Sequence, residues 1–225
     1  METLESKLDL TKADPLYYKA KVTPDLVHLG DYYYLTIAGQ SAPEDPQFLQ
    51  AIEAIYAVAY GIKFINKAED NDFVVPKMEC NWWIAGGLAQ QHLFTQAPRS
   101  EWYWKISIRM PDMVASDHFF RAVHLAKTKK AHIKSLEDVK FESFEEGLCV
   151  QILHKGSWED EQPSIGQLMD YVKANQLEIT SYHKEIYLTD PKRVTPEKLK
   201  TILRYQVKRS GLHLNPIQAN LKNGH

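Results

Sequence analysis

The chain has 225 residues, of which 44% are hydrophobic, and its formal net charge is -2. This length and apolar content are sufficient for a globular domain with its own core. The balanced charge lacks the basic surface with which nucleic-acid-binding proteins attract phosphates, so we expect no nucleic-acid partner. Cys80 and Cys149 show neither metal-ligand spacing nor a disulfide framework. This indicates a reduced chain without a structural metal.

No segment of the sequence has the pattern of an export signal or of a membrane helix. Residues 1–7 carry acidic side chains and lack an apolar region. The longest apolar stretch, 54–62, is much shorter than the roughly 20 residues that span a bilayer. We therefore expect a cytoplasmic protein without a membrane partner.

The first half of the chain predicts the order β-α-β-β. Residues 32–39 are typical of a strand, and Asp45 followed by Pro46 predicts the start of a helix. Two strand-like runs follow, at 73–83 and 102–110, and the second alternates apolar with polar residues. Helical spacing predicts one buried stripe on the helix, with Gly61 near its end; the stripe comprises Phe48, Leu49, Ile52, Ile55, Tyr56 and Ala59.

A connecting segment separates the two halves of the chain. Asp117 is expected to cap a helix that turns Phe119, Phe120, Val123 and Ala126 inward. A lysine cluster at 127–130 follows this pattern, and we interpret it as the solvated end of that helix.

The second half repeats the order of the first. A strand-like run at 149–155 leads into a glycine-containing turn, a helical segment begins near Pro163, and strand-like runs follow at 181–188 and 200–207. Arginines in the late strands, Arg109, Arg204 and Arg209, are interpreted as charges that protect sheet edges.

The motifs of the second half resemble those of GyrI-like small-molecule-binding domains. The resemblance rests on His154-x-Gly156-x-Trp158, the helix after it, the run from Glu185-x-Tyr187 to Asp190-Pro191, and the closing strand. Trp158 is a departure, because the family more often has a tyrosine there.

The resemblance and the repeated order predict one α+β domain over residues 1–225. We expect duplicated β-α-β-β units that form a pseudo-twofold antiparallel sheet assembly, with helices outside and a central ligand groove. Repeat one covers about 30–112, the connecting helix and linker 113–141, repeat two 142–209 and a C-terminal tail 210–225.

Glu185 is the acid that we expect to act on a ligand. Period-2 spacing places it on one strand face with His183 and Tyr187, and Glu79 holds the corresponding place in the first repeat. A buried carboxylate needs a partner or a ligand, whereas an exposed one has no special role. Glu79 has the alternative of a surface pair with Lys77 or Lys105.

Aromatic residues are frequent in the predicted strands and are expected to line the groove. Flat or cationic ligands stack on such rings, although aromatic side chains also favour strands and fill cores. The expected substrate-binding residues are Glu79 and His154 together with Tyr34, Trp82, Trp83, Trp104, Trp158 and Tyr182.

Among GyrI-like proteins the chain resembles the free-standing cyclopropanoid cyclopropyl hydrolases. The resemblance implies hydrolysis of yatakemycin-type or duocarmycin-type compounds by water, with Glu185 as general base and Tyr187 or His154 as donor to the carbonyl oxygen. His154 has the alternative of satisfying a turn carbonyl.

No cofactor and no metal are implied, and the oligomeric state stays open. The expected partner is a small aromatic or polycyclic ligand. A non-catalytic multidrug-binding protein and a gyrase-inhibitor-like interaction module are the alternative functions.

Overall fold

The computed structural model describes residues 7–210, so the predictions for the first six residues and for most of the C-terminal tail lie outside the described residues. Six strands form a closed antiparallel barrel in the order β1-β3-β2-β6-β7-β4, and β4 pairs with β7 to close it. These strands are β1 (Asp25–Gln40), β2 (Met78–Trp83), β3 (Tyr103–Met110), β4 (Lys140–Lys155), β6 (His183–Tyr187) and β7 (Lys200–Arg209).

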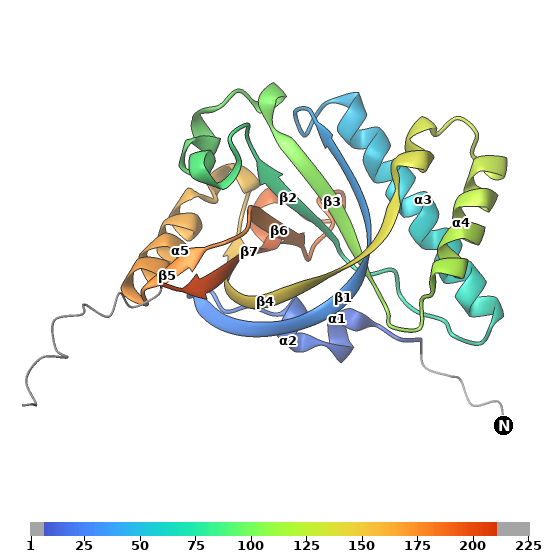
Figure 1. Ribbon diagram of the computed structural model, residues 1–225, viewed down its shortest axis with the longest axis horizontal. Helices are drawn as coiled ribbons and strands as arrows, with labels where there is room; N and C mark the ends of the chain where they lie inside the picture. The colour runs from blue at the N-terminus through green and yellow to red at the C-terminus, as the bar shows by residue number, and fades with distance from the viewer. Residues whose placement is uncertain (1–6, 211–225) are drawn as a thin grey trace, which may run out of the picture.

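The mixed α+β class is confirmed, and so is the order β-α-β-β in each half. The first half contains β1, α3 (Pro46–Ala68), β2 and β3; the second contains β4, α5 (Gln162–Ala174), β6 and β7. A short β5 (Leu177–Ile179) pairs with the end of β7. The expected sheet assembly needs a correction, because the strands close on themselves into a barrel. Figure 1 shows α3 and α5 on different sides of it.

Helix α3 is the main helix of the core. The side chain of Asp45 accepts a hydrogen bond from the backbone N–H of Gln47, and Pro46 occupies the first turn, as predicted. The prediction for Leu49 is wrong, because this side chain is 54% exposed. Gly61 does not end the helix; it lies where a Cβ would come within 3.0 Å of Ala122 in α4 (Ser116–Lys129), so it permits close helix packing.

By length and composition alone, α3 could cross a membrane. Its buried side chains instead pack on β1, β3 and α4, as expected of a core helix. Figure 1 shows α4 alongside α3. Helix α4 differs in two respects from its prediction. Its N-cap is Ala115 rather than Asp117, and Phe120 is 67% exposed, whereas Phe119 is buried.

The alternation predicted for β3 is confirmed and separates the two faces of the barrel wall. Trp104, Ile106 and Ile108 pack in the core cluster that α3 covers. The residues between them turn into the barrel. The interpretation of Arg109 and Arg204 as edge charges is wrong, because both are buried and the Arg109 guanidinium lies 2.7 Å from Asp14. Arg209 is exposed at the end of β7.

Two short helices, α1 (Leu10–Ala13) and α2 (Pro15–Tyr18), lie under the barrel in Figure 1. Leu10, Tyr17 and Tyr18 form a buried cluster with side chains of several strands, including Ile186 and Ile202. Burying aromatic rings in this way contributes strongly to a core. The remaining helical turns are η1 (Gly87–Gln96), η2 (Arg99–Glu101), η3 (Lys134–Asp138), η4 (Trp158–Asp160) and η5 (Pro196–Lys198).

Candidate functional site

Successive side chains of strand β6 point to opposite faces of the barrel wall. His183, Glu185 and Tyr187 share one face, as predicted from the spacing. That face is the outer one, whereas the expected central groove would place Glu185 inside, and Lys184 and Ile186 point into the barrel. Glu185 lies opposite Cys80 of β2, and His183 lies opposite Trp82. We call the outward group the outer site; it consists of Trp82, Trp158, Glu161, His183, Glu185 and Tyr187.

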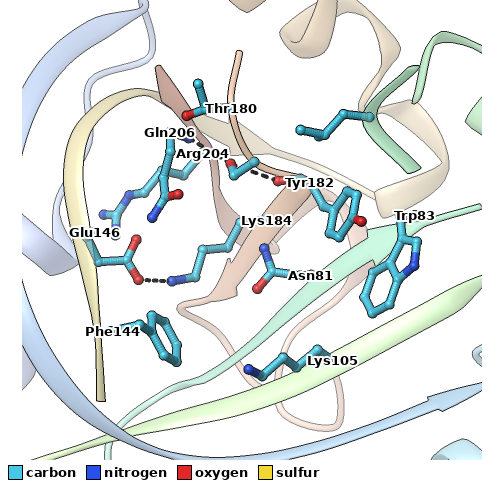
Figure 2. Close-up of a pocket in the computed structure, with 12 residues that line it drawn as sticks. Asn81, Trp83, Lys105, Phe144, Glu146, Thr180, Tyr182, Lys184, Arg204 and Gln206 are labelled. Carbon is cyan, nitrogen blue, oxygen red and sulfur yellow. Dashed lines mark hydrogen bonds and ion pairs between the residues drawn. The ribbon is translucent and has the colours of Figure 1, made fainter. Parts of the chain in front are cut away.

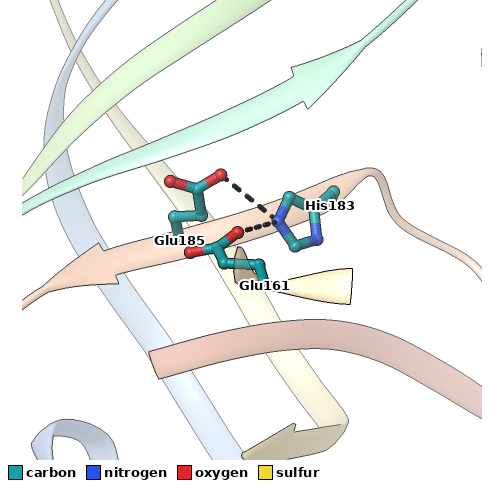
Figure 3. Close-up of side chains that lie close together, drawn as sticks. All are labelled: Glu161, His183 and Glu185. Atoms are coloured by element: carbon teal, nitrogen blue, oxygen red, sulfur yellow. Dashed lines mark ion pairs between the residues drawn. The ribbon is translucent and has the colours of Figure 1, made fainter. Parts of the chain in front are cut away.

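An imidazole between two carboxylates forms the centre of the outer site. His183 Nε2 lies 3.3 Å from Glu185 Oε1 and 3.7 Å from Glu161 Oε2, as Figure 3 shows. The other ring nitrogen is 2.8 Å from the hydroxyl of Tyr205. Glu185 keeps 12% of its side chain exposed, against 7% for Glu161 and 4% for His183. Glu185 is therefore the acid of the cluster that a ligand can approach most easily.

Burial and charge shift the pKa values of this cluster. Burial, followed by the nearby charge of Glu185, raises the pKa of Glu161 from 4.5 to about 7. Burial alone would lower the pKa of His183, but Tyr205 and the two carboxylates outweigh it and raise the pKa well above 6.5. The shift of His183 favours the positively charged imidazole, which pairs with Glu185, whereas the shift of Glu161 favours its neutral carboxyl form near pH 7.

The same three residues offer donor atoms within 4.8 Å of one another, a spacing that suits a metal ion. Two carboxylates and one imidazole are common metal ligands. The protonated imidazole supplies the positive charge that the carboxylates require, and an imidazole must lose its proton before it binds a metal. Among the described residues, the second oxygen of Glu161, Oε1, has no hydrogen-bond partner.

Aromatic side chains surround Tyr187, two residues after Glu185 on the same strand face. The indole N–H of Trp82 donates to the Tyr187 hydroxyl at 3.3 Å, and the Trp158 ring meets the Tyr187 ring edge-on with centroids 5.6 Å apart. Trp158 is 41% exposed, and its indole N–H donates to Thr201. Burial, and then the charge of Glu185, raise the pKa of Tyr187 well above its ordinary value, so its hydroxyl stays protonated and can donate.

The inner face of the same strands holds a second charged cluster. Lys184 Nζ lies 2.9 Å from Glu79 Oε2 and forms a second ion pair with Glu146. Tyr17 donates to Glu79 at 2.7 Å, and Tyr34 donates to Glu146 at 2.8 Å. The alternative of a surface pair for Glu79 with Lys77 or Lys105 is wrong, because this side chain is fully buried and binds Lys184.

A pocket of about 420 Å³ opens at the mouth of the barrel above this cluster (Figure 2). Trp83 and Tyr182 stack at its rim, with ring centroids 4.7 Å apart and planes inclined by 12°. We call it the barrel pocket; its lining residues are Asn81, Trp83, Leu88, Lys105, Phe144, Glu146, Thr180, Ser181, Tyr182, Lys184, Arg204 and Gln206.

The structure divides the residues predicted for one groove among several places. Glu185, Tyr187, Trp82 and Trp158 come together in the outer site. Trp83 and Tyr182 lie at the barrel pocket, and Tyr34 and Glu79 lie in the inner charged cluster.

Two of the predicted residues have structural contacts of their own. Trp104 packs on Phe48 in the core and donates to Ser41. His154 donates to the Ser157 carbonyl at 2.9 Å, which is the turn contact considered as its alternative.

The sequence pattern did not indicate a role for Glu161, Glu146 or Lys184. Glu161 ends an acidic run, 159–161, just before Pro163, which is typical of an exposed helix start. Lys184 and Glu146 are charged residues in strands that would face solvent if the sheet were open. Only barrel closure, which brings β4 beside β7, encloses them.

Comparison with known proteins agrees with this architecture. A profile of the GyrI-like small molecule binding domain matches residues 23–208. The crystal structure of an uncharacterized conserved protein from Listeria innocua is 31% identical, with a TM-score of 0.81, and the alignment covers 90% of this chain and 100% of that one.

Two crystal structures of hydrolases from Listeria innocua are each 30% identical to this chain, with TM-scores of 0.78 and 0.80. The alignments cover 90% of this chain and 100% of each hydrolase chain. Comparison with curated proteins gave no match. The profile match spans most of the chain, and the chain therefore belongs to the family of GyrI-like small-molecule-binding domains.

Proposed function

We propose that the protein is a hydrolase that adds water to the activated cyclopropane of flat, DNA-alkylating compounds of the yatakemycin and duocarmycin type. The observation that carries this proposal is the partly exposed Glu185 carboxylate beside the Tyr187 hydroxyl. The rings of Trp82 and Trp158 contact Tyr187. A base, a hydrogen-bond donor and aromatic walls are the groups that this reaction requires.

The reaction needs one proton acceptor and one hydrogen-bond donor. Glu185 takes a proton from water as the water oxygen bonds to the unsubstituted ring carbon. The carbon–carbon bond of the strained ring breaks, and its electron pair moves through the dienone onto the carbonyl oxygen, which becomes a phenolate. The Tyr187 hydroxyl donates a hydrogen bond to this oxygen as its charge develops. The phenolate then takes up a proton, so that the sum is the addition of one water.

His183 and Glu161 position the base. The imidazolium contacts one oxygen of Glu185, which leaves the second oxygen outside this ion pair (Figure 3). Glu161 Oε2 contacts the same ring nitrogen at 3.7 Å, so rotation of the imidazole would disrupt its contacts with both acids. General-base catalysis typically raises a reaction rate by about 10²- to 10⁴-fold. A large part of this gain requires that the base is held in a fixed orientation.

The relatives support the hydrolytic part of this proposal. Two crystal structures of Listeria innocua hydrolases share 30% identity with the chain over 90% of its length. Proteins that share a fold can act on different substrates, so the proposed substrate class rests on the chemistry of the outer site.

A direct test uses a duocarmycin-type compound in water enriched in heavy oxygen. We expect a product that has gained one labelled water, detected by mass spectrometry, at a rate proportional to protein concentration. If the compound is retained by the protein but recovered without added water, the chain is a binding protein and the hydrolase proposal fails.

Binding without turnover is the second candidate function. Aromatic rings beside a carboxylate also suit amphipathic cations, through stacking and cation–π contacts. In that case Glu185→Gln would weaken the affinity for cationic dyes but leave that for neutral ones, and the labelled-water experiment would give no product.

A further inference from the structure

The barrel pocket is separated from the outer site by the barrel wall itself. Lys184 lines the pocket, whereas its neighbour Glu185 points to the other face. The same holds for Trp83 and Trp82 in β2, since Trp83 stacks at the pocket rim and Trp82 contacts Tyr187. A volume of about 420 Å³ lies within the range typical of small-molecule sites. The outer site does not account for this cavity.

Two buried polar atoms on the pocket-lining residues have no partner among residues 7–210. They are Glu146 Oε2 and Arg204 Nη1. The other oxygen of Glu146 accepts from Tyr34 and Lys184, and the other guanidinium nitrogens of Arg204 donate to Gln151 and to a backbone carbonyl.

Both residues are at least 98% buried, because their exposed fractions are 2% and 0%. Leaving such groups without a hydrogen bond is costly, and native structures rarely do so without a ligand, water or functional reason. Two residues that line the pocket therefore carry one acceptor and one donor without a partner among the described residues.

The charges at the pocket floor cancel. Glu79 and Glu146 face Lys184 and Arg204, which gives two negative and two positive side chains in one enclosed cluster. Burial would raise the pKa of Glu146, but Lys184 and Arg204 outweigh it and the pKa is lowered, so Glu146 accepts hydrogen bonds as a carboxylate. An additional charge on a ligand would be unbalanced there, so the floor suits an uncharged molecule.

Flat aromatic surfaces border the pocket above the floor. Trp83 and Tyr182 stack on one side, and Phe144 lies on the other (Figure 2). Phe144 itself stacks on Tyr34, with centroids 4.1 Å apart. Such surfaces favour a planar ring. Lys105 lies 5.0 Å above the Phe144 ring, at the open end.

We infer that the barrel pocket is a second ligand site, which binds an uncharged planar lactam. The lactam N–H donates to Glu146 Oε2, its carbonyl accepts from Arg204 Nη1, and its ring lies among Trp83, Tyr182 and Phe144. Because the two sites lie on opposite faces of the wall, this site does not depend on the hydrolysis proposed for Glu185.

The test uses 2-quinolone, a lactam fused to a benzene ring, and N-methyl-2-quinolone, which lacks the N–H donor. In calorimetric titrations of the native protein, we expect the affinity for 2-quinolone to be at least about tenfold higher than that for N-methyl-2-quinolone. The methylated compound cannot donate the hydrogen bond to the buried carboxylate. Equal affinities for the two compounds, or no binding of either, would overturn the inference. Water would then be the hydrogen-bond partner of the two polar atoms.

Tryptophan indole resonances locate the bound lactam. Trp83 should shift on titration with 2-quinolone and Trp82 should not; the reverse pattern would place the lactam in the outer site and contradict the inference. Glu146→Gln replaces the acceptor with an amide and should weaken 2-quinolone binding about tenfold or more. Trp83→Leu tests the rim without changing the buried charges and should also weaken binding.

Glu185→Gln separates this inference from the proposed function. It should leave 2-quinolone affinity within about twofold of the native value, because the carboxylate lies on the other face of the wall. If hydrolysis fails but these affinities hold, the barrel pocket stands by itself. If Glu185→Gln lost affinity for 2-quinolone as well as hydrolysis, the barrel pocket and the outer site would be one ligand site, and the inference would be wrong.

Discussion

Lys184 and Glu185 are neighbours in β6, yet they belong to two regions with opposite properties. Lys184 lies inside the barrel, where two acids and a tyrosine hydroxyl satisfy it and only 6% of its side chain is exposed. Glu185 lies on the outer face, where one ion pair holds it next to a half-exposed tryptophan ring. The inner charges mainly hold the structure together, whereas the outer charge remains available for chemistry.

The largest expected effect is on stability and comes from the inner region. Lys184→Met leaves Glu79 and Glu146 without their shared cation, and removing one partner of a buried pair costs about 3–5 kcal/mol. Urea unfolding should show this loss. Lys105→Met is the matched control, because Lys105 is 34% exposed in its pair with Glu142 and should cost about 1 kcal/mol or less. Similar losses in the free energy of unfolding for the two variants would contradict the claim that the inner charges hold the structure together.

The raised pKa of Glu161 in the outer site should make the stability of the protein depend on pH. Because the folded-state pKa of Glu161 is raised to about 7 from 4.5, the folded state binds this proton more tightly than the unfolded state does. Stability is therefore lost as pH rises from about 4.5 to 7, by up to about 3 kcal/mol.

Glu161→Gln keeps an uncharged group there and should flatten this slope. The raised pKa of His183 acts in the same direction, since its contribution is full below pH 6.5 and falls only as pH rises through the folded value. Unfolding free energies at several pH values test this, and a native protein whose stability rises over the interval would contradict it.

Tyr187→Phe should lower the rate of ring opening about hundredfold, as the loss of one hydrogen-bond donor to a developing oxyanion typically does. Stopped assays with mass detection would measure the rate constant. Tyr103→Phe is the control on the other face, where the ring stacks on Trp83, and it should not change the rate. An undiminished rate in Tyr187→Phe would remove the donor from the mechanism.

Trp158→Ala should have the smallest effect, a rise in KM of about tenfold or less, because one aromatic contact is worth about 0.5–1.5 kcal/mol. Trp158→Tyr restores a ring and should recover most of the affinity. If Trp158→Ala leaves KM unchanged while kcat falls, the ring acts on the chemistry rather than on binding.

Local patterns predicted the strands, the main helix and the faces of β3 and β6, because period-2 spacing and the Asp45–Pro46 cap depend on neighbouring residues alone. Barrel closure could not be predicted in this way. The pairing of β4 with β7 joins residues about 50 positions apart, such as Ile152 and Leu203, and no local pattern records it. The two-fold relation of the repeats and their boundaries stay predictions.

Closure also explains the errors in the predicted site. Arg204 in an open sheet would be an edge charge, whereas in the barrel it is buried and donates to Gln151. Glu79 and Glu185 occupy corresponding strands, but a difference of one residue in pairing turns them to opposite faces, since Cys80 rather than Glu79 lies opposite Glu185. Acids at equivalent positions in two repeats therefore need not meet.

The central claim is that Glu185 acts as a general base at the outer site. The most direct measurement is the ring-opening rate of Glu185→Gln against Glu178→Gln, a control with the same chemical change at a side chain that is 58% exposed on β5. We predict a loss of at least about a hundredfold in the ring-opening rate for Glu185→Gln alone. Equal rates in the two variants would contradict the account.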